Sequence, residues 1–393
     1  MKLLVIADDL TGALDTGVRL GAKNTLVRIM EEAAPLDPVP EETQVLIIAA
    51  QTRHLSPEKA YERVFSIVSQ AKKAGVACVY KKTDSALRGN IGAELAGARD
   101  ALGKTMHFVP AFPCMNRVTR GGVHYIDGVP VNESVFGADP FEPVEFAAVG
   151  DIIARQAAPE GIEIHDAQTD EDIFRIAREL KDKGELQLLS GCAGFAAALP
   201  EVLGLEREDN PPRVFGKGLL TVCGSINPIT TRQLDAGESS GMARCRLGAE
   251  EKLSGQWREK IPLWLSALEE KGSLIIDCGD TYSQAEKARF EAKYGCLRTK
   301  IAQNMGMIAR EMMLGGMEST MLITGGDTLL AFMAQLGIWE FTAIWELCPG
   351  IALCHIEYMG KKYALISKSG GFGERELLSH LAERLAKLCT GGM

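Results

Sequence analysis

One phrase recurs along this sequence and constrains its fold: a short apolar run, a polar turn and then a helical period. The runs KLLVI, TQVLIIAA, GVACVY and MHFVPAF each fit a buried strand that ends in a polar turn. After TQVLIIAA, Ser56 is expected to cap a helix with Pro57 in its first turn. The apolar face of that helix should consist of Ala60, Val64, Ile67, Val68 and Ala71. This alternation predicts a parallel sheet with helices on both faces and ligands beyond the carboxyl ends of the strands.

The alternation is interrupted twice, which suggests how the chain is divided. In GGVHYIDGVPVNES, Asp127-Gly128 predicts a hairpin that forms a lid or an edge. Residues 206–217 combine charge, prolines and glycines, as is typical of a linker. Strand-like runs restart after it, in LLTVCGS, LIIDCG, TMLITGG and KKYALISKS. The 393 residues therefore predict two α/β domains with largely parallel sheets, 1–210 and 211–393, and an active site in the cleft between them.

Composition excludes several classes of protein. With 46% hydrophobic and 24% charged residues, the chain resembles an ordinary globular protein. A net charge of −9 without blocks of lysine and arginine argues against binding to nucleic acid or to an anionic membrane. The opening MKLLVIADDL has too short an apolar run for a signal peptide or a spanning helix. We expect a cytoplasmic protein with small-molecule partners.

Cysteine and histidine give no sign of a metal centre. None of the ten cysteines forms a C-x-x-C pair, and most lie in apolar runs, so buried free thiols are expected. The six histidines are scattered along the chain, so no structural zinc site is predicted.

Polar side chains gather three times where a strand of the first domain ends. The first turn carries Asp8 and Asp9, the second carries Arg53, and the third carries Lys81, Lys82, Asp84, Ser85 and Arg88. In a parallel sheet these loops converge on one crevice. An aspartate, Asp9 or Asp8, could accept the proton of a substrate hydroxyl during phosphoryl transfer, and the Arg53 fork suits a substrate carboxylate.

Each of these residues also has a simpler interpretation. Asp8 or Asp9 could only cap the following helix, and Arg53 could form a surface ion pair. Lys81 is expected to be solvated. For Asp9, Arg53 and the segment from Lys82 to Ser85 we favour a functional role, because the same edge of the sheet is polar three times.

The second domain has three turns of small residues after apolar strands: CGSIN, TGGDT and KSGGFG. Small residues let backbone N–H groups and a helix N-terminus approach phosphate closely, although glycines also serve simply as helix caps. No G-x-x-x-x-G-K-[ST] or G-x-G-x-x-G motif is present, which argues against a P-loop ATPase and a nicotinamide dehydrogenase. Leu10 stands where phosphoaspartate enzymes need a second carboxylate. A nucleotide site of another kind remains.

In this order, the motifs IADDLTGALDTG, QTRHLS, KKTDSALRGN, LSGCAGFAAAL, CGSINPIT, TGGDT, ELCPG and SKSGGFG resemble those of the four-carbon acid sugar kinases, which phosphorylate tetronates with ATP. The resemblance implies an N-terminal sugar-acid domain, a C-terminal nucleotide domain, ATP with Mg²⁺, and transfer to a terminal hydroxyl. By motif it implies substrate contacts from Asp9, Arg53, Lys82, Thr83, Asp84, Ser85 and Arg88. It implies ATP contacts from Ser225, Gly325, Gly326, Asp327, Thr328, Gly370 and Gly371, although the family usually has glutamate at the position of Asp327.

The resulting hypothesis is a kinase that forms the 4-phosphate of D-threonate or D-erythronate. A 3-oxo-tetronate 4-kinase is the nearest enzymatic alternative, since one hydrogen bond separates such substrates. A sensor that binds nucleotide and sugar acid without turnover stays open as well. The sequence is compatible with a homodimer.

Overall fold

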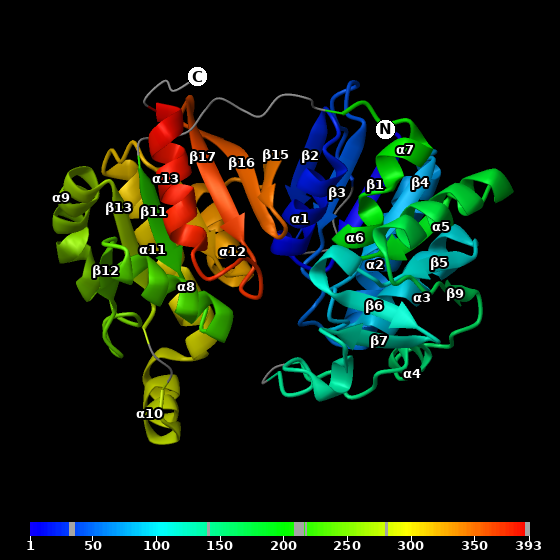
Figure 1. The fold of residues 1–393 in the computed structure, drawn as a ribbon, viewed down its shortest axis with the longest axis horizontal. Coiled ribbons are helices and arrows are strands. Elements are labelled where there is room, and N and C mark those ends of the chain that lie inside the picture. Colours follow the sequence, from blue (N-terminus) through cyan, green and yellow to red (C-terminus); the bar gives the residue numbers. More distant parts are fainter. Residues whose placement is uncertain (31–35, 140–141, 208–215, 217, 280–281, 390–393) are drawn as a thin grey trace. The chain divides into compact units, whose positions relative to one another are not determined.

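The structure, a computed structural model, describes residues 1–30, 36–139, 142–207, 216, 218–279 and 282–389 (Figure 1). Its chain divides into two compact units, unit 1 (Met1–Asp209) and unit 2 (Asn210–Met393). Of the expected linker, residues 208–215 and 217 lie outside the described residues.

Unit 1 is built around a parallel sheet with the strand order β2-β3-β1-β4-β10-β5-β9. The order reverses around β1, because β3 pairs with one side of this strand and β4 with the other. A small antiparallel sheet, β6-β7-β8, is separate from it. The strands are β1 (Leu3–Ala7), β2 (Thr25–Ile29), β3 (Val45–Ala49), β4 (Cys78–Lys82), β5 (Met106–Val109), β6 (Arg117–Arg120), β7 (Val123–Ile126), β8 (Val129–Pro130), β9 (Ile162–Ile164) and β10 (Leu188–Gly191).

The helices of unit 1 alternate with these strands, as the repeated sequence phrase predicts. They are α1 (Leu10–Leu20), α2 (Pro57–Lys73), α3 (Ile91–Leu102), α4 (Val149–Ala154), α5 (Asp170–Lys183), α6 (Ala193–Ala196) and α7 (Leu199–Leu203). Ser56 caps α2, and the buried face of that helix consists of the five apolar residues that the sequence pattern selects. The Asp127-Gly128 hairpin is also confirmed, since both residues have positive φ and join β7 to β8.

Unit 2 has the strand order β12-β13-β11-β14-β17-β16-β15, in which β15 and β16 run antiparallel to their neighbours. The strands are β11 (Leu219–Cys223), β12 (Ala243–Arg246), β13 (Ser273–Asp277), β14 (Thr320–Thr324), β15 (Glu340–Cys348), β16 (Ile351–Tyr358) and β17 (Lys361–Lys368). The helices are α8 (Pro228–Ser239), α9 (Ile261–Lys271), α10 (Gln284–Tyr294), α11 (Leu297–Leu314), α12 (Gly326–Leu336) and α13 (Leu377–Cys389). The prediction of an α/β protein with largely parallel sheets is confirmed.

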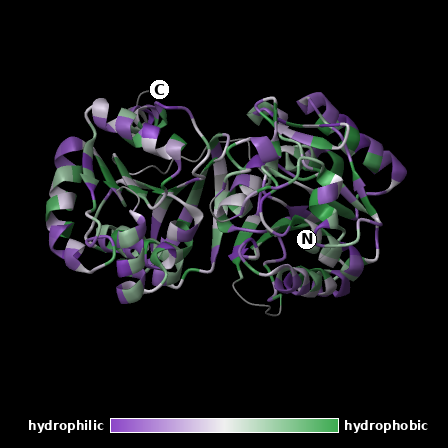
Figure 2. Cartoon of the chain, turned by 90° about the horizontal axis from the view of Figure 1, so that it is seen from below, coloured by the Kyte–Doolittle hydropathy of each residue, from purple (hydrophilic) through white to green (hydrophobic). Residues whose placement is uncertain are grey.

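The burial of the strands explains why these sheets form. Every residue of β1 and β3 is buried, and both strands consist only of aliphatic side chains, which suits a sheet covered on both faces. In Figure 2 the strands are mostly green, whereas the helices carry purple on their outer faces. No helix in the described part of the chain combines the length and the apolar character needed to cross a bilayer.

Two expectations about cysteine and histidine are corrected. Among the described cysteines, Cys114 and Cys296 are exposed, so burial does not hold for all of them. The histidines are not all scattered, because His107 and His165 lie side by side with their ring nitrogens 3.2 Å apart. The two residues are far apart in the sequence, and the pairing of β5 with β9 brings them together.

Helices α3 and α4 approach so closely that a side chain at Gly92 has no room. A Cβ atom there would lie 2.3 Å from the carbonyl oxygen of Ile153. We expect Gly92→Ala to lower the free energy of unfolding by about 1–3 kcal/mol, because two backbones must separate. Gly150→Ala in α4 is the matched control, since a Cβ at Gly150 meets nothing within 4 Å. Urea denaturation of both variants checks this, and equal midpoints would contradict the close packing.

Candidate functional site

Three polar loops of unit 1 meet at the carboxyl edge of its sheet, where β3, β1 and β4 are neighbours (Figure 1). Asp8 and Asp9 follow β1, Arg53 follows β3, and the segment 83–88 follows β4. The reversal of strand order at β1 makes this the switch point of the sheet, which is the usual ligand position in such folds. The sequence-based expectation that these loops converge agrees with the strand order.

Arg53 is the centre of this cluster. Its Nε and Nη2 atoms each lie 2.7 Å from Asp8 Oδ2, and its Nη1 lies 2.6 Å from Asp9 Oδ2. Asp84 Oδ1 is 3.6 Å from Nη2. Burial alone would lower the pKa of Arg53, but these three carboxylates raise it well above its ordinary value. In this structure, therefore, the guanidinium is already paired with carboxylates of the protein.

Asp9 has the capping role that the sequence left open, and its role as a base stays a prediction. It is the N-cap of α1, where its Oδ1 accepts a 2.6 Å hydrogen bond from the backbone N–H of Gly12. Its Oδ2 accepts a hydrogen bond from the Thr11 hydroxyl besides the contact with Arg53. The side chain stays 18% exposed, against 3% for Asp8. A ligand can thus reach Asp9 more easily than Asp8.

Asp8 is a buried carboxylate, and one of its two oxygens makes no hydrogen bond in the described chain. Its Oδ1 has no hydrogen-bond partner among the described residues. Burial would raise its pKa, but Arg53, Lys82 and Lys81 lower it, so the group is ionised at neutral pH. The Oγ1 atom of Thr83 is likewise buried without a partner in the described chain. Such orphaned polar atoms are rare and are typical of sites that a ligand or water completes.

Lys81 corrects an expectation, because it is buried and not solvated. Its Nζ lies 2.7 Å from Oε2 of Glu94 on α3 and donates to the carbonyl of Lys82. Burial raises the pKa of Glu94, against the effect of Lys81. Removing either partner would leave an uncompensated buried charge, so the pair fixes α3 under the loop.

The loop after β4 is held by further ion pairs. Arg88 donates hydrogen bonds to the Asp84 carboxylate from Nε (2.9 Å) and Nη2 (3.0 Å). Its Nη1 donates to Asp139 Oδ2. Burial would raise the pKa of Asp84, but Arg88 and then Arg53 hold it well below its usual range. Arg117, which the sequence reasoning missed, donates to the Ser85 hydroxyl. It lies on β6, and no strand-end pattern pointed to it.

Lys82 and Asn90 complete the arrangement. Lys82 is buried beside Asp8, and its Nζ donates to the carbonyl of Thr83 at 2.7 Å. Asn90, a second residue that the sequence reasoning missed, donates from Nδ2 to the carbonyls of Thr52 and Leu55, both at 2.9 Å. The amide thereby ties the loop after β4 to the loop after β3.

A cavity of about 410 Å³ opens beside the cluster. Arg53, Arg88 and Asn90 line it, together with residues from the segment 142–156. Asp8, Asp9 and Lys82 do not line this cavity, so it adjoins the cluster through the two arginines. A volume of this size is within the range of small-molecule sites.

In unit 2, the three glycine and serine loops follow β11, β14 and β17, which are consecutive in the sheet. A Cβ at Gly224 would lie 1.9 Å from Thr328 Oγ1, and one at Gly370 would lie 2.9 Å from Ser225 Oγ. Gly325 has a φ of 105° and occupies the N-cap of α12 without any side-chain cap. The sequence-predicted nucleotide residues therefore lie together, and the N–H groups that open α12 have no side-chain acceptor at the cap.

Lys368 ends β17 inside this group of loops and was not among the predicted contacts. It is buried, and its Nζ donates to Thr230 Oγ1 and Ser369 O, both at 3.1 Å, and to Gly370 O at 3.4 Å. These partners carry no formal charge. Burial lowers the pKa of Lys368 to about 8. A signal existed in the sequence, because a lysine directly precedes the small residues of SGGFG.

Asp327 lies in the first turn of α12, where its Oδ2 accepts a 2.6 Å hydrogen bond from Nε of Arg298 on α11. Both side chains are about a third to a half exposed. The carboxylate thus points to a neighbouring helix through a surface ion pair, which contributes little to stability.

In comparisons with known proteins, each of the two units matches a different domain family. Residues 3–163 match the family model described as a sugar-binding N-terminal domain, and residues 220–378 match the nucleotide-binding C-terminal domain. A D-threonate kinase from Salmonella typhimurium is 27% identical over 96% of this chain and 97% of its own length. A D-erythronate kinase from Heliobacterium modesticaldum is 30% identical over 61% of each chain.

More distant similarities extend over the whole chain. A 3-oxo-tetronate kinase from Pectobacterium atrosepticum is 23% identical over 98% of this chain and 100% of its own. A solved structure from Salmonella typhimurium, provisionally described as a tRNA synthase, shares the fold with a TM-score of 0.76 at 20% identity, covering 98% of this chain and 99% of that one. With both domain models and full-length relatives in agreement, the chain belongs to the four-carbon acid sugar kinase family.

Proposed function

We propose that the protein is an ATP-dependent kinase that phosphorylates the terminal hydroxyl of D-threonate or D-erythronate. The observation that carries this proposal is the cluster of Arg53 with Asp8, Asp9 and Asp84 at the switch point of unit 1. Carboxylates bind hydroxyls and accept their protons, whereas a guanidinium binds the carboxylate of an acid. The relatives that are D-threonate and D-erythronate kinases support this substrate class.

Asp9 is the base in this proposal, because it contacts the same arginine as Asp8 and is the more exposed of the two. Asp8 holds Arg53 in place from the buried side. Arg53 orients the acid, and the Thr83 hydroxyl, which has no partner among the described residues, offers a hydrogen bond to a substrate hydroxyl. The Lys82 ammonium supplies positive charge next to Asp8. Together these residues position the acceptor and take its proton.

The loops of unit 2 fit a nucleotide by two observations: glycines whose Cβ atoms would crowd the neighbouring loops, and a buried Lys368 whose hydrogen-bond partners are uncharged. Backbone N–H groups around Ser225, Gly325 and Gly370 would bind the phosphates. Asp327 is the acidic side chain of these loops and would face the ribose or a hydrated Mg²⁺. ATP with Mg²⁺ supplies the phosphoryl group and neutralises charge on its oxygens.

Two alternative functions differ from this proposal, one in its substrate and the other in having no turnover. A 3-oxo-tetronate kinase would use the same residues on a substrate that differs by one oxidation level, and relatives of that kind are 23–25% identical to this chain. A sensor would bind both ligands without turnover. A cytoplasmic location and a homodimer stay predictions from the sequence.

The first test is an ADP-release assay with ATP, Mg²⁺ and a panel of acids: D-threonate, D-erythronate, L-threonate and 3-oxo-tetronates. We expect turnover with D-threonate or D-erythronate. Asp9→Asn keeps a side chain that can cap α1 but cannot accept the proton, so kcat should fall by about 10²–10⁴-fold with α1 intact. Turnover restricted to a 3-oxo-tetronate would select the alternative substrate. Binding of both ligands without turnover by the unmodified protein would support a sensor.

The nucleotide loops have a clean steric probe in Gly371, because a Cβ there meets nothing within 4 Å in the protein. We expect Gly371→Val to weaken ATP binding by about tenfold or more, since a bulky side chain would occupy phosphate space. Gly248→Val, also in unit 2 and with only ordinary contacts near its Cβ, should leave ATP affinity unchanged. Calorimetric titration of both variants measures this. Equal affinities would place the nucleotide elsewhere.

The titration of Lys368 predicts the direction in which ATP affinity changes with pH. Its pKa of about 8 makes it a cation below that pH and neutral above it. ATP affinity should therefore decrease as the pH rises through 8, by up to about tenfold per pH unit. Lys368→Met should bind ATP more weakly and lose this pH dependence. An unchanged pH profile in Lys368→Met would rule out the role of the ammonium group.

A further inference from the structure

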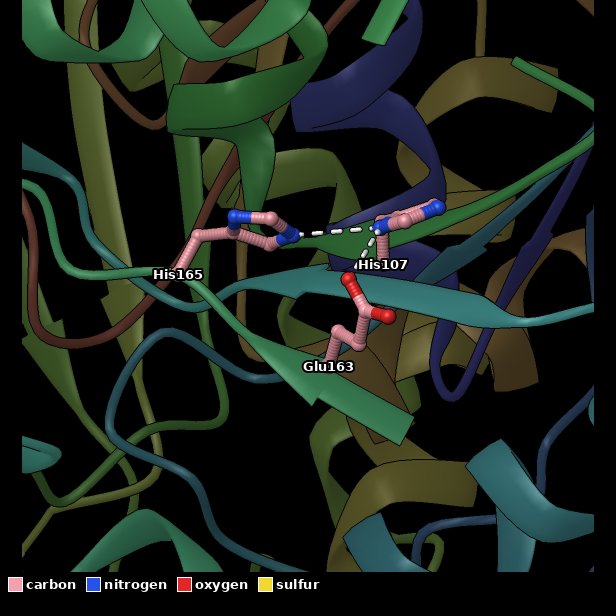
Figure 3. Close-up of side chains that lie close together, drawn as sticks. All are labelled: His107, Glu163 and His165. Atoms are coloured by element: carbon pink, nitrogen blue, oxygen red, sulfur yellow. Dashed lines mark hydrogen bonds and ion pairs between the residues drawn. The ribbon is translucent and has the colours of Figure 1, made fainter. Parts of the chain in front are cut away.

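A second cluster of ligand-type side chains lies at the edge of the unit 1 sheet, outside the acidic cluster around Arg53. The cluster consists of His107 on β5, Glu163 on β9 and His165 just after β9, and Figure 3 shows His165 and Glu163 each directing one atom toward a ring nitrogen of His107. These atoms all lie within 4.8 Å of one another. Because β9 is the last strand in the unit 1 order of described strands, the cluster joins an edge strand to its neighbour β5.

Two of the three separations between these atoms are close to those in a coordination shell. His107 Nδ1 is 3.2 Å from His165 Nε2 and 3.4 Å from Glu163 Oε2. Ligand atoms at the corners of a tetrahedral Zn²⁺ site are about 3.4 Å apart, given metal–ligand distances near 2.1 Å. The separations of His107 from His165 and from Glu163 are close to this value, and the third pair lies within 4.8 Å.

Backbone contacts fix this arrangement. His107 and Glu163 are directly paired in the parallel register of β5 and β9. The backbone N–H of His165 donates a 2.9 Å hydrogen bond to the carbonyl of Phe108. All three ligand positions are therefore set by one strand pair and do not depend on a flexible loop, which limits the entropy lost on binding.

A second carboxylate, that of Glu185, lies on the side of His107 away from the cluster. Glu185 Oε2 lies 3.7 Å from Nε2, the ring nitrogen that points away from the cluster. In metal sites, a carboxylate that accepts the second N–H of a ligating histidine fixes its tautomer and raises its basicity. At 3.7 Å the Glu185 contact is an ion pair longer than a hydrogen bond, and its charge favours a proton on Nε2, which leaves the lone pair of Nδ1 on the side of Glu163 and His165.

The local charge favours a cation. Glu163 and Glu185 are negative, Glu179 adds a third carboxylate near His165, and Lys183 opposes them with one positive charge. Glu163 and His165 keep solvent access, so an ion can enter from outside.

We propose that His107, Glu163 and His165 bind one divalent transition-metal ion of the Zn²⁺ class. Two imidazoles and one carboxylate suit Zn²⁺ and disfavour Mg²⁺ or Ca²⁺, which prefer oxygen ligands. The ion pins β9 to β5 and so stabilises the sheet edge of unit 1, with water in the fourth position. The site takes no part in the proposed phosphoryl transfer, and its test does not depend on kinase activity.

The experiment uses untagged full-length protein stripped with a chelator and titrated with Zn²⁺ against a chromophoric competitor. We expect one ion per chain and a Zn²⁺-dependent rise in melting temperature. His165→Ala should weaken binding by at least about 100-fold, and Glu185→Gln by about 10–100-fold as an outer partner. Glu163→Gln, at an exposed side chain, gives a second variant that keeps the fold.

Two control variants distinguish binding at this cluster from binding elsewhere on the chain. Glu179→Gln removes one nearby negative charge without touching a ligand and should bind Zn²⁺ nearly as well as the unmodified protein. Cys296→Ser removes an exposed thiol that could bind zinc adventitiously. The absence of stoichiometric binding would mean that His107 and His165 share only a hydrogen bond. Binding that survives both His165→Ala and Glu163→Gln, or that is lost in Cys296→Ser, would equally overturn the proposal.

Discussion

The pairing of Arg53 with three carboxylates is the interaction on which the candidate site of unit 1 depends. Asp8, Asp9 and Asp84 come from two different loops and would repel one another in a buried setting. Arg53, from a third loop, neutralises them through contacts of 2.6–3.6 Å. Yet Asp8 Oδ1 and Thr83 Oγ1 are buried without partners in the described chain. The ion pairs thus hold the loops in place, while these two atoms keep hydrogen-bonding capacity for a ligand or water.

Sequence pattern predicted much of the fold, because its signals are local. The cap of α2 by Ser56, the buried face of that helix and the Asp127-Gly128 turn depend on residues close in sequence, and all are confirmed. The convergence of the loops in unit 1 follows from the parallel sheet. The partners of the loop residues do not follow in this way, because Lys81 finds Glu94 on α3 only after tertiary packing.

The contact between His107 and His165 is a clearer example of a feature that local sequence patterns cannot predict. His107 and His165 are 58 residues apart, and nothing in their local sequence relates them. Their contact depends on β9 pairing with β5 in one register, and a shift by one residue would turn Glu163 to the other face of the sheet. Register is a property of the whole sheet, so the periodicity of single segments could not disclose this cluster.

The buried lysines at strand ends differ in whether a carboxylate of the protein lies beside them. Lys81 is matched by Glu94 and Lys82 lies beside Asp8, so the protein itself balances both charges. Lys368 has hydroxyl and carbonyl partners instead, and burial lowers its pKa to about 8. A buried ammonium without a carboxylate is costly unless an anion arrives to compensate it. In the proposed function, the phosphates of a nucleotide bound at these loops would supply that anion.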